Sequence, residues 1–395
     1  MHIAIFLDQP ETTLGGLQNS VQLQKKYLER LGHTVTLCCP ATKADQPSPA
    51  HIRVPSWHLQ GEYRMYIPTK RKLKALDAQF AQLPPIDIVH IQADYWAAIL
   101  GFAFAKRHNL PTVITYHTNV AFTAAKLLGP VLGGLLNCGL AASSAYMLGP
   151  ARAGAWTDAW TQVRNLAAHA DLVLTPSKHF ARSLQEHGVR QPVEVMSNGI
   201  DDDVLASVTR TPAPEPTFIW LGRLSQEKRF MELLAAIAAA DVPARYEIFG
   251  TGALLQPGRQ FVARHHLQGR VHFNGHKSYQ DVMTAIASAD ALVQTSIGFE
   301  TQGMTVLEAA MLGTPSILSD KLIAEDFPPD AYYLVADDSI NALADSLRKV
   351  YAELKAGTHH RVVMDADNDY RQSRMSARAV SLYQKLLVSH LKERK

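Results

Sequence analysis

Short runs of apolar residues, many of them β-branched, recur along the first half of the chain with helix-length segments between them. The runs occupy residues 2–7, 34–39, 86–91, 112–116 and 171–177. Continuous apolar runs of this length are typical of strands that are buried on both faces. The segment 20–31, which follows the first run, carries apolar residues at helical spacing. Alternating strands and helices predict a parallel sheet.

The same alternation begins again after 209–216, where three prolines predict a linker. The runs expected to be strands in this second half occupy 217–222, 244–250, 270–275, 291–296 and 315–320. Two doubly wound α/β domains in series are therefore predicted, and ligands bind such sheets at the carboxyl ends of the strands. The last stretch, 376–395, has the apolar periodicity and the basic end of an amphipathic helix.

The composition narrows the class of protein. A chain of 395 residues with 47% hydrophobic and 19% charged residues is typical of a globular protein with about two or three domains. The net charge of +3 gives no reason to expect a nucleic-acid partner. The three cysteines, two of them adjacent, predict neither a disulfide framework nor a zinc site. The first apolar run lacks the basic segment of a secretory signal, so we expect a cytoplasmic protein.

One uncharged stretch, 127–151, is long enough to cross a bilayer. Glycines, prolines and polar residues recur within it, and we expect them to interrupt any helix repeatedly. This composition argues against a membrane-spanning segment.

Two loops carry candidate chemistry, the first a weak signal and the second a moderately specific one. Gly15 and Gly16 follow the first strand and precede a helix, so their amides can approach a phosphate closely, although an ordinary turn would also use glycine. The pair is not the spaced dinucleotide-binding fingerprint, which argues against a nicotinamide dehydrogenase. Arg223 and Lys228 follow the first strand of the second half, where two cations can clamp a diphosphate. A solvated basic turn is the alternative.

A third segment is more specific. Glu300 and Glu308 are separated by seven residues, Gly303 lies between them, and a helix is predicted to begin near Met304. Amides at that helix N-terminus can bind phosphate, and two carboxylates can accept hydrogen bonds from sugar hydroxyls. Alternatively, Glu308 is an N-terminal helix carboxylate favoured by the helix dipole. The acidic run 201–203 imitates a metal-binding motif, but we expect a solvated turn there.

Together, these glycine, cation and glutamate pairs resemble the retaining enzymes of glycosyltransferase family 4, and segment 197–201, SNGID, is similar to the family's hinge. The resemblance covers nearly the whole chain. It implies an α/β protein with the GT-B fold, in which two Rossmann-like doubly wound domains face each other across a cleft. The implied divisions are an acceptor-binding domain at 1–195, a hinge at 196–216, a nucleotide-sugar-binding domain at 217–375 and a helix at 376–395 that packs back on the first domain.

The resemblance also implies roles for single residues. Glu300 would contact the hydroxyls of the donor sugar, and Glu308 the ribose of its nucleotide. Arg223 and Lys228 would hold the diphosphate. The remaining implied donor contacts are Gly15, Gly16, Gly275, His276, Lys277, Gly303, Met304 and Thr305.

His117, in TYHTN at 115–119, matches a family histidine beside the donor sugar. Taken alone, one histidine among 17 would more often be structural. The implied catalytic set is His117, Arg223, Lys228 and Glu300.

The implied reaction is hexosyl transfer with retention from a nucleotide sugar, which is a substrate rather than a cofactor. Positive groups would stabilise the leaving diphosphate, and the diphosphate oxygen would take the acceptor's proton, so neither a general base nor a metal ion is expected. A uridine diphosphate hexose is the favoured donor, and guanosine diphosphate mannose stays open.

The segments 299–303, FETQG, and MTVLEA after it resemble the subgroup that glycosylates diacylglycerol. A lipid acceptor would fit the uncharged stretch 127–151, as an apolar channel or an interfacial surface beside a basic group. The basic group consists of Lys70, Arg71, Lys72 and Lys74. The protein would then lie peripherally on the inner, anionic face of the membrane. Core helices and a solvated basic helix face are the alternative reading.

The segment after His117, VAFTAAK, departs from the acidic, tyrosine-containing run expected of the diacylglycerol subgroup. Phosphatidylinositol, a polyprenol-linked sugar and a soluble sugar or small metabolite therefore stay open as acceptors. Two other classes are a sugar-nucleotide epimerase and a nucleotide-sugar-binding protein without catalysis. Because Arg223, Lys228, Glu300 and Glu308 are all present, an enzyme is favoured over a silent binding protein.

Overall fold

The chain folds into two compact units. The computed structural model describes residues 1–13, 16–42, 50–60, 63–119, 129–149, 155–365 and 369–393. The first unit comprises Met1–Gly199 and Gln372–Lys395, and the second comprises Ile200–Arg371. The last helix, α15 (Gln372–Glu393), therefore belongs to the first unit although it ends the chain.

The first unit is built on a seven-stranded parallel sheet with the order β3-β2-β1-β6-β7-β8-β9. Its strands are β1 (His2–Leu7), β2 (Thr34–Pro40), β3 (His51–Val54), β6 (Ile88–Gln92), β7 (Thr112–Thr115), β8 (Leu172–Thr175) and β9 (Val193–Val195). The five strands predicted from apolar runs are confirmed. The edge strands β3 and β9 escaped that pattern because they are short and only partly buried. An antiparallel hairpin, β4 (Trp57–Gln60) and β5 (Tyr63–Met65), lies outside the sheet order.

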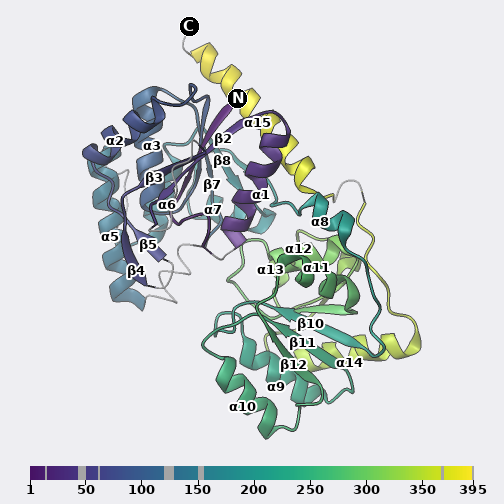
Figure 1. Cartoon of the computed structure of the whole chain (residues 1–395). Coiled ribbons are helices and arrows are strands. Elements are labelled where there is room, and N and C mark those ends of the chain that lie inside the picture. Colours follow the sequence, from purple (N-terminus) through teal and green to yellow (C-terminus); the bar gives the residue numbers. More distant parts are fainter. Residues whose placement is uncertain are drawn as a thin grey trace. The chain divides into compact units, whose positions relative to one another are not determined.

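Alternate side chains of each strand point to opposite faces of this sheet. Since strands such as β1 are buried at every position, both faces are covered by helices. Ile3 and Ile5 of β1 pack in one core cluster with α1 (Gly16–Arg30) and α15, whereas Phe6 packs in the other. The helices of the second cluster include α2 (Lys70–Phe80), α3 (Trp96–His108), α5 (Gly129–Leu148), α6 (Ala159–Ala167) and α7 (Lys178–Glu186). Figure 1 shows α1 and α15 side by side, and α2, α3 and α5 together on the other side of the sheet.

The C-terminal helix is tied to the first sheet by a buried polar chain. The hydroxyl of Tyr383, on α15, lies 2.7 Å from Nδ1 of His90 on β6, and Nε2 of His90 lies 2.7 Å from the Thr115 hydroxyl on β7. Burial lowers the pKa of His90 to about 3, so its ring is neutral and each ring nitrogen has a hydroxyl partner. The sequence pattern predicted this helix, which begins four residues earlier than expected.

The second unit is built on a six-stranded parallel sheet with the order β12-β11-β10-β13-β14-β15. Its strands are β10 (Thr217–Leu221), β11 (Arg245–Phe249), β12 (Val271–Gly275), β13 (Ala291–Gln294), β14 (Ser316–Leu318) and β15 (Tyr332–Leu334). The first five match the predicted runs. With two parallel sheets, each covered by helices on both faces, the predicted pair of Rossmann-like units is confirmed.

The helices of the second unit divide between two core clusters, one on each face of its sheet (Figure 1). One face carries α9 (Phe230–Ala240), α10 (Leu255–Arg264) and α14 (Ile340–Ala356). The other carries α8 (Asp202–Ser207), α11 (Tyr279–Ser288), α12 (Met304–Met311), α13 (Lys321–Ala324) and the 3₁₀ helix η2 (Pro329–Ala331).

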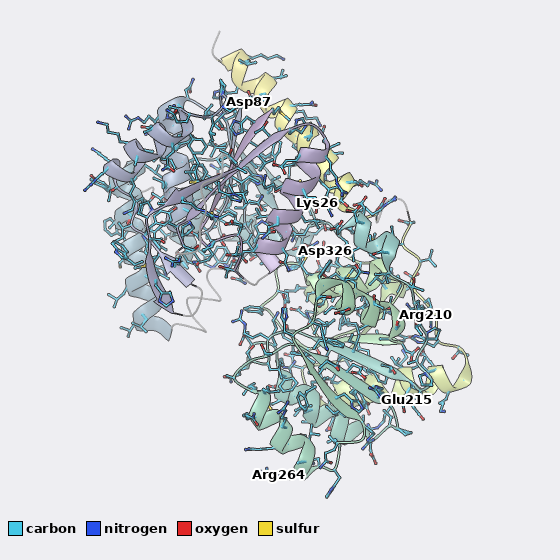
Figure 2. All side chains as sticks on the ribbon, in the orientation of Figure 1. Lys26, Asp87, Arg210, Glu215, Arg264 and Asp326 are labelled. Carbon is cyan, nitrogen blue, oxygen red and sulfur yellow. The ribbon has the colours of Figure 1, made fainter. Side chains whose placement is uncertain are left out.

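The segment that leads from α14 back to α15 is held against the second unit by side-chain hydrogen bonds to backbone carbonyls. Arg361 donates to the carbonyls of Ala289 at 2.7 Å and Ala287 at 2.9 Å. The Tyr370 hydroxyl donates to the carbonyl of Asp326 at 3.3 Å, and Asp326 is labelled in Figure 2. The two bonds from Arg361 satisfy carbonyls at the end of α11, where a helix leaves them unpaired, and the bond from Tyr370 satisfies a carbonyl just after α13.

Two expectations about local structure were wrong. Helices were expected to be interrupted repeatedly within 127–151, but over its described part α5 is a continuous helix through Gly133, Gly134 and Gly139. Each internal glycine costs roughly 1 kcal/mol of helix stability relative to alanine, and packing against α3 and α6 offsets this cost. The acidic run 201–203 is not a turn either, because Asp201 caps α8 by accepting a hydrogen bond from the Asp203 amide at 3.1 Å.

Candidate active site

The loops after β10 and β11 lie in backbone contact, which only glycine permits. A Cβ atom added at Gly250 would lie 1.9 Å from the carbonyl oxygen of Gly222, and one added at Gly252 would lie 2.4 Å from that of Leu224. This contact fixes the path of the loop 222–229, which carries Arg223 and Lys228. The two glycines of the sequence FGTG, at the end of β11, indicate such a close approach of two backbones, but the sequence analysis did not use them.

Lys228 and Glu300 are brought together directly. The ammonium group of Lys228 forms an ion pair with Oε1 of Glu300, and it lies 4.8 Å from the centroid of the Phe299 ring. Oε1 of Glu300 also accepts a hydrogen bond from the Ser296 hydroxyl at 3.2 Å. Lys228 follows β10 and Glu300 follows β13, and these two strands are hydrogen-bonded neighbours. The carboxyl ends of adjacent parallel strands thus bring a cation and an anion from distant sequence positions into contact.

Arg223 shares the loop with Lys228 but is far more exposed. Its side chain is 63% exposed, and its guanidinium lies 3.8 Å from the carboxylate of Glu227. A surface pair of this kind contributes little to stability. The Arg223 side chain is therefore open to solvent and available to an incoming anion.

The amides of Met304 and Thr305 begin α12, as predicted. Gly303 precedes them in a left-handed conformation with a φ of 77°, where it caps the helix without a side-chain oxygen. The first-turn amides therefore present the positive end of the helix dipole, beginning four residues after Glu300. A Cβ atom at position 303 would also lie 3.1 Å from Cγ2 of Ile323, so both conformation and space favour glycine.

Glu308 is buried in α12, beyond its first turn, and it is held by Tyr279. The Tyr279 hydroxyl hydrogen-bonds to the Glu308 carboxyl group. Burial raises the pKa of Glu308 to about 7, although the bond from Tyr279 opposes this shift. A carboxylate favoured only by the helix dipole would lie in the first turn, so that alternative does not describe Glu308. No sequence pattern indicated Tyr279.

The loop after β12 carries the remaining donor candidates of the second unit. Gly275 ends β12 in a left-handed conformation with a φ of 66°, and its carbonyl accepts a hydrogen bond from the Gly250 amide at 2.8 Å. His276 and Lys277 are exposed. Tyr279 begins α11 two residues later, so the partner of Glu308 comes from the end of this loop. The structure thus brings the second unit's donor candidates to the carboxyl edge of one sheet.

In the first unit, His117 follows β7 and is held from the side by β6. Its Nε2 lies 3.0 Å from Oε1 of Gln92, and Gln92 in turn donates to Oε1 of Gln24 on α1. Burial lowers the pKa of His117 to about 4, so the ring is neutral. Since a glutamine oxygen only accepts, Nε2 carries the proton. Neither glutamine was singled out in the sequence.

A small cavity of about 20 Å³ lies behind this histidine, within the first unit. Its lining includes His117, Gln92, Asn198 of the SNGID segment, Gly199 and Gln372. Asn198 accepts a hydrogen bond from the Ser20 hydroxyl at 2.7 Å. A Cβ atom at Gly199 would lie 2.5 Å from Oε1 of Gln372, so this position requires glycine. Residues 197–199 of the SNGID segment therefore line the same cavity as His117.

Gly16 begins α1, whereas Gly15 lies outside the described residues. The loop before them is anchored by Glu11, whose carboxylate accepts two hydrogen bonds from Arg53 at 2.6 Å each. Burial opposes the charge of Glu11, but the bonds from Arg53 and from Cys39 outweigh it and lower the pKa of Glu11 to about 2. This buried ion pair positions the chain that leads to the glycine pair.

Two family models match the chain in succession. The model described as Glycosyltransferase Family 4 matches residues 14–204, and the model described as Glycosyl transferases group 1 matches residues 201–362. The chain belongs to glycosyltransferase family 4. Together the two matches span both units.

This family 4 glycosyltransferase has relatives that are distant in sequence. It is 24% identical to the alpha-monoglucosyldiacylglycerol synthase of Streptococcus pneumoniae, over 93% of this chain and 86% of that protein. It is 27% identical to a GDP-mannose-dependent alpha-mannosyltransferase of Mycobacterium tuberculosis, over 81% of this chain and 79% of that protein. Among solved structures, Anabaena HepE in complex with UDP has a TM-score of 0.68 at 14% identity, covering 98% of this chain and 100% of that chain. This likeness supports the GT-B fold.

The protein is thus a glycosyltransferase with the GT-B fold. Its second unit groups a cation pair, two glutamates and a helix N-terminus, whereas His117 and Gly16 belong to the first unit. Over the ranges that the structure describes, no cluster of three or more His, Cys, Asp or Glu side chains suits a metal ion.

Proposed function

We propose that this family 4 glycosyltransferase transfers a hexose, with retention, from a nucleotide-sugar donor to a hydroxyl group of a membrane lipid such as diacylglycerol. The donor that we favour is a uridine diphosphate hexose. The observation that carries the lipid acceptor is an uncharged, exposed stripe on α5 that lies against the basic helix α2.

The stripe consists of positions at helical spacing on α5: Leu132, Leu135, Gly139, Ala142 and Tyr146, with Val131 at its start. Val131 is 73% exposed and Leu135 is 65% exposed, while Leu140 and Leu148 on the opposite side are buried. The window Val131–Leu148 is long and apolar enough to cross a membrane by length and composition, and a third of it is buried in the protein. A helix with one face packed on the protein and one uncharged face exposed suits the membrane interface better than a span.

The basic group lies beside this stripe. Nζ of Lys70, on α2, lies 5.5 Å from the centroid of the Tyr146 ring on α5. Nζ of Lys72 lies 5.5 Å from the centroid of the exposed Trp57 ring. Cations adjacent to exposed aromatic and aliphatic side chains match an anionic lipid surface, where headgroups meet the acyl region. We infer a peripheral protein on the inner face of the membrane.

The relatives support this acceptor. The pneumococcal relative is named for a product built on diacylglycerol, and it aligns over 93% of this chain. The solved structure of HepE contains UDP, which supports a uridine nucleotide donor. The mycobacterial relative is named for GDP-mannose, so guanosine diphosphate mannose is the second donor to test.

In the proposed donor complex, Arg223 and Lys228 hold the diphosphate and the amides of Gly303, Met304 and Thr305 bind its oxygens. Glu300 accepts hydrogen bonds from the sugar hydroxyls, and Glu308 from the ribose. Gly275, His276 and Lys277 contact the base, and Gly15 and Gly16 contact the donor from the first unit. The pre-formed ion pair between Lys228 and Glu300 supports these roles, because it orients both groups before the donor binds.

The bond between the sugar's anomeric carbon and the diphosphate oxygen breaks, and its electron pair goes to the leaving diphosphate. The acceptor oxygen forms the new bond to that carbon on the same face, and its proton goes to the diphosphate oxygen. Lys228 and Arg223 stabilise the developing negative charge, so the proposed reaction needs no metal ion. Retention is supported by the mycobacterial relative, whose name assigns an alpha linkage to its product.

His117 is proposed to stand beside the donor sugar. Its neutral ring binds a sugar hydroxyl, and its backbone carbonyl faces the positive charge that develops at the anomeric carbon. The bond from Nε2 to Gln92 supports this role, since it leaves a ring of fixed tautomer and orientation.

The test is a donor and acceptor screen with purified protein in EDTA. Radiolabelled UDP-glucose, UDP-galactose, UDP-N-acetylglucosamine or GDP-mannose is incubated with dioleoylglycerol, phosphatidylinositol or maltose. Label in the organic phase from a uridine diphosphate hexose and dioleoylglycerol supports the proposal. Label confined to maltose overturns the lipid acceptor, and a strict need for added Mg²⁺ or Mn²⁺ overturns metal independence. The anomeric configuration of the product, measured from NMR coupling constants and compared with that of the donor, tests retention.

A further inference from the structure

Asp94 lies in the loop between β6 and α3, at the carboxyl edge of the first unit's sheet. A neighbouring carboxylate, Asp8, follows β1 and accepts hydrogen bonds from the backbone amides of Asp94 and Tyr95 at 2.8 Å and of Ala97 at 2.9 Å. Asp8 therefore caps the start of α3 from another strand. This capping explains the burial of Asp8, but it does not explain a second buried carboxyl group beside it.

The loops after β6 and β7 are joined by two successive side-chain bonds. The first links Gln92 to His117, and the second links Asp94 to the hydroxyl of Thr118. Asp94 therefore lies two residues after Gln92, which orients His117, and it is bonded to the residue that follows His117. Both bonds lie within the first unit.

One oxygen of Asp94 lacks a partner. The residue is 5% exposed, and its Oδ1 has no hydrogen-bond partner among the described residues. A buried polar atom without a partner costs stability, and native proteins keep very few of them. A ligand oxygen at this edge of the sheet would satisfy it.

We propose that Asp94 binds the acceptor, by donating a hydrogen bond from its free oxygen to an oxygen atom beside the hydroxyl that attacks the donor. In diacylglycerol this atom is an ester carbonyl oxygen, which can only accept. The inference rests on the proposed function for the existence of an acceptor, but it applies to a lipid and to a soluble sugar alike. Asp94 is then an acceptor-binding residue that the family resemblance did not assign.

The protonation state of Asp94 allows its carboxyl group to donate a hydrogen bond. Burial and the nearby charge of Asp8 raise the pKa of Asp94 to about 8, while the bond with Thr118 opposes this shift. Burial raises the pKa of Asp8 as well, but the three backbone hydrogen bonds that it accepts oppose this shift and favour its ionised form. Among the described residues, the bond that opposes the shift at Asp94 comes from Thr118 alone, so we assign the proton of the pair to Asp94 at pH 7. Within the part of the chain that the structure describes, the other titratable groups that interact with Asp94 are Tyr95 and Tyr116, and burial raises the pKa of both phenols, which stay neutral.

The test uses Asp94→Asn and Asp94→Ala in the full chain. An amide can still donate a hydrogen bond, so D94N should keep the acceptor KM within about threefold, whereas D94A should raise it about tenfold or more. The donor Kd, measured by calorimetry with UDP, should stay unchanged in both variants. The wild-type kcat/KM for the acceptor should fall as pH rises through about 8, because ionised Asp94 no longer donates; D94N should lose this fall.

Asp87→Asn is the matched control. Asp87, labelled in Figure 2, precedes the same strand β6 at its amino end, where its carboxylate accepts a hydrogen bond from the His2 amide at 2.7 Å. D87N should keep the wild-type pH profile and acceptor KM. An acceptor KM that is unchanged in D94A, or a D94N pH profile that matches the wild type, would overturn the proposal and leave Asp94 a structural residue.

The acceptor in these assays is whichever of dioleoylglycerol, phosphatidylinositol and maltose takes the label. If only maltose does, the lipid part of the proposed function is wrong, and the Asp94 variants are compared on maltose. If dioleoylglycerol takes the label and the variants leave its KM unchanged, the proposed function stands and the Asp94 inference is wrong.

Discussion

The hydroxyl of Tyr279 and the carboxyl group of Glu308 are joined by a hydrogen bond, although the two residues belong to different helices, α11 and α12. This bond connects the glutamate proposed to hold the ribose with the end of the loop proposed to hold the base. The carboxyl group of Glu308 is buried, whereas the Tyr279 side chain is partly open to solvent, so the charge of Glu308 is sensitive to its surroundings.

Donor binding should depend on pH through Glu308. Because burial raises the pKa of this carboxyl group to about 7, it is half protonated near neutrality and loses an acceptor site for ribose hydroxyls as pH falls. The Kd of UDP should therefore rise as pH drops from 8 to 6, and calorimetry measures it. Glu308→Gln should bind more weakly and show a flat profile. Tyr279→Phe, which loses a bond to the charged form, should move the midpoint to higher pH. A wild-type Kd that is constant across this range would contradict the assignment.

Lys228→Ala and Arg223→Ala should each lower transfer by about two orders of magnitude or more, because each removes a positive charge from the leaving diphosphate. The effect should fall on kcat more than on the KM of the donor. Arg264→Ala is the control: Arg264 is an exposed cation on α10 of the same unit and is labelled in Figure 2. Near-normal kcat in both loop variants would exclude a role in leaving-group stabilisation.

Membrane binding should require the basic group of α2 and the stripe of α5. Each Lys or Arg near an anionic surface contributes about 1 kcal/mol, which is about fivefold in affinity. Charge reversal of Lys70 and Lys72 should reduce sedimentation with phosphatidylglycerol vesicles and remove most of its salt dependence. Leu132→Ser with Leu135→Ser should weaken binding at every salt concentration. Reversal of Lys349 and Lys355 on α14 is the control, and equal losses there would point to nonspecific charge attraction.

Tyr383→Phe should destabilise the first unit by about 1–3 kcal/mol, because it leaves the buried Nδ1 of His90 without its partner. Urea unfolding followed by circular dichroism measures this loss. Tyr146→Phe removes a hydroxyl from an exposed ring on α5 and should change stability by less than about 0.5 kcal/mol. If the two variants were equally stable, the buried polar chain would not anchor α15.

Much of the fold and of the candidate site was predictable from the order of residues along the chain. All ten apolar runs that were predicted to be strands match strands of the two sheets, because strands of a covered parallel sheet are buried on both faces and must be apolar throughout. A helix was predicted to begin near Met304 because the segment MTVLEAAML has a helical pattern, and α12 begins there. Arg223, Lys228 and Glu300 stood out because they follow strands, where doubly wound sheets bind their ligands, and Glu308 because it lies on the helix that follows Glu300.

Other features depend on contacts between distant parts of the chain. The pairing of Lys228 with Glu300 follows from the adjacency of β10 and β13, and no local pattern encodes strand order. The partners Tyr279, Gln92 and Asp94 are ordinary residues in their own segments, and burial alone makes their polar atoms significant. The glycines of α5 predicted interruption, but packing on α3 and α6 outweighed their local cost.

The sequence by itself determined the architecture and the residue types of the site, because hydrophobic period and loop position are local properties. Only the tertiary structure decided which of those residues meet, which carboxyl groups hold a proton near pH 7 and which apolar positions of α5 are exposed. These properties depend on burial and on distances through space, and both arise from packing elements that the chain order keeps apart.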